Sequence, residues 1–197
     1  MTPRFLIEDA ISAFGQFNGR FSQVEDDFWE VLWEVERILK PDENVRFQTI
    51  NAVDNGSYLS YGFVEPPNVI DVLRVVEQGS GRELQRIELR EFWVFPRFVP
   101  SGSVFAFRHF DEVLLINRDN SVNPPLVYDV SYFVFSDRVT VDTDVPSLER
   151  LFPVVRLGLL GRLAGKVKDV ERFELFQRRY EQALGLMRER GDAGDSG

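Results

Sequence analysis

The chain has 197 residues, of which 44% are hydrophobic, so it is long enough for one domain with a proper core or for a small domain carrying a large insertion. It contains no cysteine, which excludes disulfide scaffolds, thiolate zinc sites and cysteine nucleophiles. Its formal net charge of -9 disfavours nonspecific binding of nucleic acid by the surface as a whole.

No segment is expected to direct the chain into or across a membrane. The apolar stretch within residues 1–12 contains Glu8 and Asp9, which a signal peptide would not tolerate. The most apolar later stretch, residues 151–163, is interrupted by a proline and two arginines, so no uncharged run approaches the length of about 18 residues that a membrane span needs. We therefore expect a soluble protein without membrane contacts, made in a cytoplasm.

The N-terminal forty residues have a helical pattern. Residues 5–14 predict a short helix, and a stronger apolar stripe follows from Val24 until Pro41 stops it. Ser22 and Glu25 have the spacing of a capping box, which predicts that the second helix begins there. Its opposite face is expected to be in water and carries Asp26, Asp27, Glu30, Glu34 and Arg37.

From Val45 the hydrophobic period changes to that of β-strands. The predicted strands are residues 45–50, 58–63, 69–76, 83–89, 104–110, 113–117 and 126–135. The turn sequence 78–81 is expected to join strands 69–76 and 83–89 as a hairpin, and the turn at 111–112 is expected to join 104–110 and 113–117 as another. Residues 90–95 are ambiguous and allow one helical turn.

Helices resume at the C-terminal end. Pro146 predicts a helix start, and Pro153 is expected to kink or restart that helix because its ring removes a hydrogen bond. Glycines recur after it at Gly158, Gly161 and Gly165, and they permit close backbone approach. Asp169 is expected to cap a final amphipathic helix that ends at Gly191.

These elements predict an α+β fold in which the terminal α-helices pack as a small helical bundle, with a large antiparallel β insertion between them. The expected helical domain combines residues 1–42 and 143–190. The expected inserted β domain is 43–142. Residues 191–197 are expected to form a flexible acidic tail.

Charge is unevenly distributed along the chain. Residues 1–149 contain 13 basic and 25 acidic residues, whereas residues 150–190 contain 10 basic and 5 acidic ones. The C-terminal segment is therefore suited to an acidic partner, although solvated helix faces would explain the same charges.

The residues give no signal for catalysis, a metal or a cofactor. The single histidine, His109, is expected at a hairpin tip, and one histidine cannot form a two-histidine metal site within a subunit. The sequence 79–81 lacks the lysine of a phosphate loop and is expected to be a turn. Asp137, Asp142 and Asp144 lack the spacing of a calcium-binding EF-hand. We therefore expect no enzyme, although two carboxylates facing each other across a cleft, as in a hydrolase, stay an alternative.

Four segments carry a resemblance to a known family: the helix 22–39, the strand region Tyr58 to Val72 with its paired prolines, the stretch Val145 to Leu160, and the amphipathic helix Val170 to Leu184. Their order resembles the adaptor, or head-completion, family of tailed bacteriophages, over roughly residues 20 to 190. The β region is longer than in the compact all-helical members of that family.

The resemblance implies a structural virion protein in the neck, between the capsid portal and the tail. It implies a homo-oligomeric ring of roughly twelve copies that docks on the portal protein, contacts other tail or neck proteins, and lets DNA pass without specific binding. It also implies that the C-terminal helix contacts the portal. The candidate interface residues there are Arg172, Arg178, Arg179, Arg188 and Arg190.

Two other functions stay open at this point. A soluble α+β ligand-binding or regulatory module would need one apolar pocket with a few converging polar groups. A phage tail-completion or stopper protein would belong to the same structural class.

Overall fold

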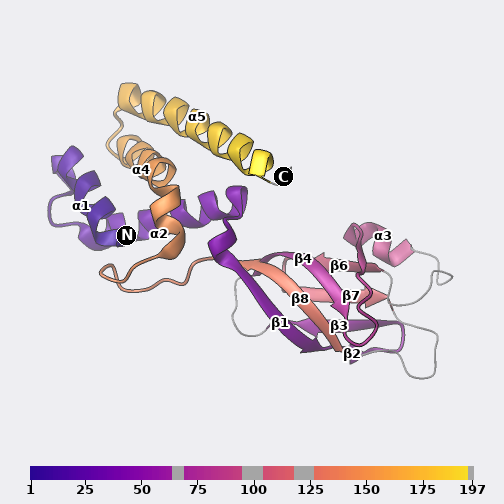
Figure 1. Ribbon diagram of the computed structural model, residues 1–197. Helices are drawn as coiled ribbons and strands as arrows, with labels where there is room; N and C mark the ends of the chain where they lie inside the picture. The colour runs from indigo at the N-terminus through magenta and orange to yellow at the C-terminus, as the bar shows by residue number, and fades with distance from the viewer. Residues whose placement is uncertain (64–68, 95–103, 118–126, 195–197) are drawn as a thin grey trace. The chain divides into compact units, whose positions relative to one another are not determined.

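The computed structural model describes residues 1–63, 69–94, 104–117 and 127–194, the last five of these by their backbone alone. It confirms the α+β class, and its contacts divide the chain into two units, shown in Figure 1. The helical unit combines residues 1–43 with 136–197, and the β unit is 44–135. The chain re-enters the helical unit at Ser136, before the expected position of 143, because Arg138 pairs with Asp26 and the Val141 carbonyl accepts a hydrogen bond from the Arg4 N–H.

The helical unit contains α1 (Pro3–Ala13), η1 (Gly15–Phe17), α2 (Phe21–Leu39), α4 (Pro146–Lys166) and α5 (Val170–Gly194), and η2 (Asp42–Asn44) spans the boundary of the two units in the sequence. The cap of α5 is as predicted, since the Arg172 N–H donates to the Asp169 carboxylate at 3.1 Å. The predicted end at Gly191 is wrong by three residues. Glycine tolerates helical dihedral angles, and no proline follows to stop the helix.

The predicted start of α2 is also wrong. The helix begins at Phe21, and the carbonyl of Arg20 accepts the first hydrogen bonds, from the N–H groups of Gln23 and Val24. Ser22 therefore lies inside the first turn, where its hydroxyl cannot cap the helix. Gly19 explains the shift: its φ of 81° turns the chain earlier than the capping pattern predicts. The C-terminal end of α2 is as predicted: Lys40 adopts the left-handed backbone conformation that ends the helix, and Pro41 follows it.

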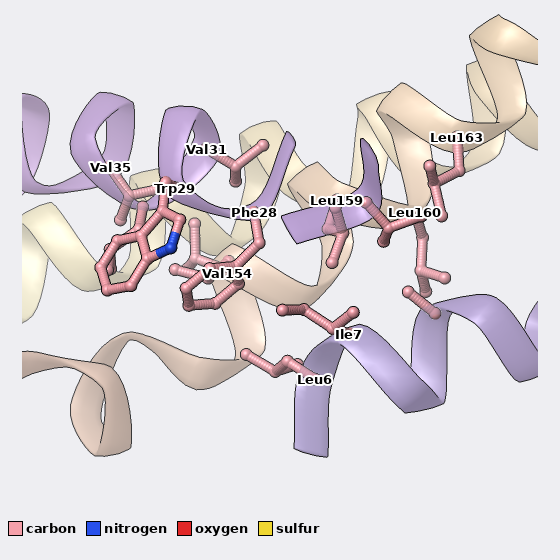
Figure 2. Close-up of a cluster of buried hydrophobic side chains, with 14 of the residues drawn as sticks. Leu6, Ile7, Phe28, Trp29, Val31, Val35, Val154, Leu159, Leu160 and Leu163 are labelled. Carbon is pink, nitrogen blue, oxygen red and sulfur yellow. The ribbon is translucent and has the colours of Figure 1, made fainter. Parts of the chain in front are cut away.

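The core of the helical unit is built by α1, α2 and α4, whose apolar faces converge as Figure 2 shows. The side chains drawn there include Leu6, Ile7, Phe28, Trp29, Val31, Val35, Val154, Leu159, Leu160 and Leu163. Trp29 is fully buried, and its indole N–H has no hydrogen-bond acceptor in the part of the chain that the structure describes. Trp33 is partly buried and donates to the Ser136 carbonyl at 2.9 Å. Both tryptophans thus widen the buried face of α2.

Helix α5 lies along α4, and glycine makes the close approach possible (Figure 1). A Cβ at Gly158 would lie 2.7 Å from Val31 Cγ1 and 3.1 Å from the ring of Tyr180. The predicted role of this glycine is confirmed. Pro153 lies within α4, which continues through it.

In its described residues, the β unit contains eight strands in two sheets, together with α3 (Leu89–Val94). The strands are β1 (Val45–Asn51), β2 (Val53–Asp54), β3 (Tyr58–Gly62), β4 (Val69–Glu77), β5 (Gln85–Arg86), β6 (Val104–Arg108), β7 (Val113–Asn117) and β8 (Val127–Val134). The strand orders are β1-β8-β4 and β2-β3-β7-β6-β5. The two sheets enclose a core to which Val72 and Val130 contribute from one sheet and Leu59 and Phe105 from the other.

The predicted hairpin of strands 69–76 and 83–89 forms only next to its turn. There an antiparallel bridge joins Val76 to Glu83, flanked by two backbone hydrogen bonds, but the pairing goes no further and β5 pairs in parallel with β6. The side chain of Arg86 explains this, because it donates to the Val72 carbonyl at 3.0 Å and forms an ion pair with the buried Asp71 at 2.7 Å. The Arg86 side chain thus lies beside β4 where further backbone pairing would otherwise form. Because β5 and β6 run parallel, the inserted β domain is not purely antiparallel.

Candidate interaction surface

Much of the basic C-terminal segment is neutralised inside the helical unit. Arg156 pairs with Asp9 at 2.7 Å, and Arg162 pairs with Glu30 and Glu34. Arg150 lies 3.8 Å from Glu43 and 3.9 Å from Asp42, and Lys166 pairs with Asp27. The charge asymmetry along the sequence therefore serves in part to hold α4 against the acidic N-terminal helices.

The pair of Asp27 and Lys166 is the most buried of these contacts. Both carboxylate oxygens of Asp27 accept hydrogen bonds from the Lys166 Nζ, at 2.7 and 2.6 Å. Asp27 is only 6% exposed, so the prediction that it faces water is wrong. The cause is α4, which covers this side of α2 and supplies the cation that makes burial of a carboxylate tolerable.

Lys166→Met should destabilise the helical unit by about 2 kcal/mol, because it leaves a buried carboxylate without its cation. The loss is smaller than for a fully enclosed pair because the Lys166 side chain is 40% exposed. Urea unfolding followed by fluorescence measures it, in a Trp93→Phe background where only Trp29 and Trp33 of the helical unit report. The double variant with Asp27→Asn should recover part of the loss; no recovery would contradict the buried-charge explanation.

The candidate arginines of α5 differ in what they contact. Arg172 lies 3.4 Å from Asp169 and over the ring of Phe14, so it is held against the helical unit. Arg178 is 77% exposed and pairs with Glu174 of the same helix at 3.6 Å.

Arg179 and Arg188 are exposed, and among the residues that the structure describes neither has an ion-pair partner. The side chain of Arg190 lies outside the described residues. The cations of α5 that are open to a partner are therefore Arg178, Arg179 and Arg188.

A second stripe of α5 faces away from the core. The inner stripe contains the buried Tyr180 and the partly buried Phe176, Ala183, Leu184 and Met187. On another side of the helix, Leu175 is 45% exposed and Leu186 is 58% exposed. Residues 175, 179, 182 and 186 follow helical spacing and lie on one side. We call Leu175, Arg179, Gln182 and Leu186 the outer stripe of α5.

Sequence reasoning missed the two leucines of the outer stripe. The helical spacing of Val170 and Phe173 with Phe176 and Tyr180 predicts that both lie on the buried face, yet Val170 is 65% exposed and Phe173 is 40% exposed. The helical spacing of residues 175, 179, 182 and 186 is the sequence feature that could have revealed them. It indicates a second stripe beside the one that packs on the core.

The orientation of α5 is set by a hydrogen bond to α2. The Tyr180 hydroxyl donates to the Glu34 carboxylate at 3.1 Å. Burial, reinforced by the negative charge of Glu34, raises the pKa of the Tyr180 phenol well above its usual value. The phenol therefore stays protonated and keeps donating near neutral pH, which fixes the side that the outer stripe occupies.

The residues considered for chemistry do not converge. His109 is exposed at the tip of the β6–β7 hairpin, as predicted, 4.8 Å from the ring of Phe107. The Arg4 guanidinium, by its hydrogen bond, lowers the pKa of Asp142, and Asp144 pairs with the N-terminal amino group. Within the described ranges no group of three or more histidines or acids could hold a metal ion. Among those same residues, no helix has the length and apolar character to cross a membrane.

The surface hollows on the described residues include two that are open to solvent. One lies on the outer face of the sheet β1-β8-β4 and is lined by Phe47, Gln48, Thr49, Arg74, Val76, Asp129, Val130 and Ser131. The other lies at the start of α2 and is lined by Gln16, Phe17, Arg20, Gln23, Lys166 and Val167.

The sequence matches no protein-family model, and a search of curated proteins finds no significant match. The relation to phage adaptors stays a prediction.

Proposed function

We propose that this protein is a structural adaptor of a tailed phage, which assembles into a ring, docks on the portal protein and joins head to tail without catalysing a reaction. The observation that supports this most directly is the outward side of α5. There, two exposed leucines lie on one side with Arg179, which has no ion-pair partner among the described residues, and another face of the helix packs on the core.

This surface has the features of a docking helix. Burying a leucine that is half exposed contributes about 1 kcal/mol, so Leu175 and Leu186 supply an apolar contact. Arg178, Arg179 and Arg188 supply attraction to an acidic acceptor. Each exposed ion pair is worth under about 1 kcal/mol, but repetition around a ring multiplies the effect.

The helix is also positioned before it binds. The Asp169 cap at one end and the Tyr180–Glu34 hydrogen bond in the middle hold α5 against the rest of the helical unit. Docking would then cost little ordering entropy, which favours affinity.

A role around a DNA channel agrees with the charge. The net charge of -9 repels phosphate, and most cations of α4 are already engaged by carboxylates of the same unit. Such a protein would let DNA pass rather than retain it.

Charge reversal at Arg178 and Arg179 tests the proposal. Arg178→Glu with Arg179→Glu should weaken binding to the portal protein of the same genome by about tenfold or more at moderate salt, since two attractions become repulsions. Binding and complex mass are measured with purified portal protein. A matched control reverses two exposed arginines elsewhere, Arg20→Glu with Arg90→Glu, and should bind normally. Failure of the unaltered chain to bind portal, or equal loss in both variants, would contradict the proposal.

A further inference from the structure

The two edges of the sheet β1-β8-β4 are built differently. Along β4 the pairing with β8 shifts register twice, between Val69 and Asp71 and between Val72 and Arg74. The chain that follows covers the outer side of β4, where the Leu84 N–H donates to the Val75 carbonyl and the Glu77 N–H to the Arg82 carbonyl, both at 2.9 Å. Bulges and covering segments are the usual protection of an edge strand.

Strand β1, at the other edge, has none of this protection from the residues that the structure describes. All seven of its residues pair with β8 in one unbroken register, from Val45 with Phe133 to Asn51 with Val127. It contains no proline and no lysine. Figure 1 shows β1 as the outermost strand of its sheet, and no other strand among the described residues pairs with its free edge. A regular, unprotected edge is a template for another strand.

The face of β1 that points away from the core carries an uncovered aromatic ring. Phe47 is 82% exposed in the middle of the strand, and Val45, Thr49 and Asn51 alternate with it on the same face. Thr49 is tied to the neighbouring strand by a hydrogen bond to Asp129 at 2.6 Å. Phe47 thus stands beside the free edge with nothing from its own sheet over it.

We propose that β1 pairs antiparallel with β1 of a second copy, about a twofold axis that passes beside Phe47. In this register the two Phe47 rings lie opposite each other, Arg46 faces Gln48 of the second copy, and Val45 faces Thr49 of the second copy. The two three-stranded sheets then become one sheet of six.

Side-chain complementarity selects both the occupant and the register. Identical antiparallel strands are related by a twofold axis, so each copy satisfies the edge of the other. A register centred on Arg46 would set two guanidinium groups opposite each other, which is unfavourable. Centring on Phe47 instead pairs the largest exposed apolar group of the strand with itself. It also sets Arg46 across from the neutral Gln48, whose amide is held by Tyr61 and Tyr132 of its own unit, so no two like charges meet.

The absence of cysteine makes this contact measurable by disulfide trapping. Two single variants, Val45→Cys and Thr49→Cys, are prepared separately and oxidised mildly, alone and as an equimolar mixture. In the proposed register a thiol at position 45 lies directly opposite a thiol at position 49, within the distance of less than about 7 Å between Cα atoms that a disulfide needs. Two thiols at position 45, or two at position 49, lie four residues apart along the strands, about 13 Å.

The mixture should therefore give several-fold more disulfide dimer than either variant alone, and Phe47→Asp added to both should return the yield to background. Circular dichroism checks that each variant is folded. No excess in the mixture, a greater yield from either variant alone, or an unchanged yield with Phe47→Asp would overturn the proposal. The proposed contact lies on the β unit, whereas the proposed portal contact lies on α5. Measuring portal binding by a Phe47→Asp variant therefore tests the adaptor role separately from the pairing of β1.

Discussion

Glu36→Leu is expected to destabilise the helical unit by about 3 kcal/mol, a large part of the stability of an ordinary domain. The Glu36 side chain is fully buried and its carboxylate accepts hydrogen bonds from the Ser136 N–H at 2.9 Å, from the Ser147 hydroxyl at 2.7 Å and from the Ser136 hydroxyl. The Glu36 carboxylate thereby joins α2 to Ser136, where the chain re-enters the helical unit, and to the first turn of α4. Leucine would leave these buried donors without an acceptor, at about 1–3 kcal/mol each.

The hydroxyls of Ser136 and Ser147 lie 3.1 Å apart and can partly compensate each other, so the expected loss is below the full sum. Fluorescence-monitored urea unfolding in the Trp93→Phe background measures it. Glu30→Leu on the same helix is the control: Glu30 is 61% exposed and pairs with Arg162, so its loss should stay under about 1 kcal/mol. Equal effects of the two changes would show that the buried carboxylate is not what joins the three segments.

Gly158→Val should cost about 3 kcal/mol and loosen α5 from α4. The added Cβ alone would lie 2.7 Å from Val31 Cγ1 and 3.1 Å from the Tyr180 ring. Neither neighbour yields easily, because a valine in a helix has one strongly preferred rotamer and the Tyr180 hydroxyl is held by Glu34. Hydrogen exchange of α5 amides should accelerate together with the loss of stability.

Another glycine of the same unit provides a control variant whose stability should rise rather than fall. Gly185 lies inside α5, and a Cβ added there would meet no atom within 4 Å beyond the adjoining stretch of its own helix, so Gly185→Ala should stabilise the helix by up to about 1 kcal/mol. Gly158→Ala gains the same helical propensity and should still be destabilising. If both alanine variants were stabilising, close approach at Gly158 would not limit the packing of α5.

Local patterns predicted the elements whose form depends on residues near them in the chain. The end of α2 before Pro41, the Asp169 cap of α5, the β6–β7 hairpin and the role of Gly158 were all predictable. Spacing, caps and turns act over a few residues, so one sequence is enough to recognise them.

Tertiary contacts alone decided the rest. The Arg86 side chain takes the place of further pairing along β4 while β5 pairs with β6, and Lys166 allows Asp27 to be buried where the helical pattern predicts water. For the candidate site, the sequence placed arginines on α5, but only the packing of α5 on α4 shows Leu175 and Leu186 facing outward. A strand's partner and a charge's burial depend on groups far away in the chain, and their positions exist only once the chain has folded.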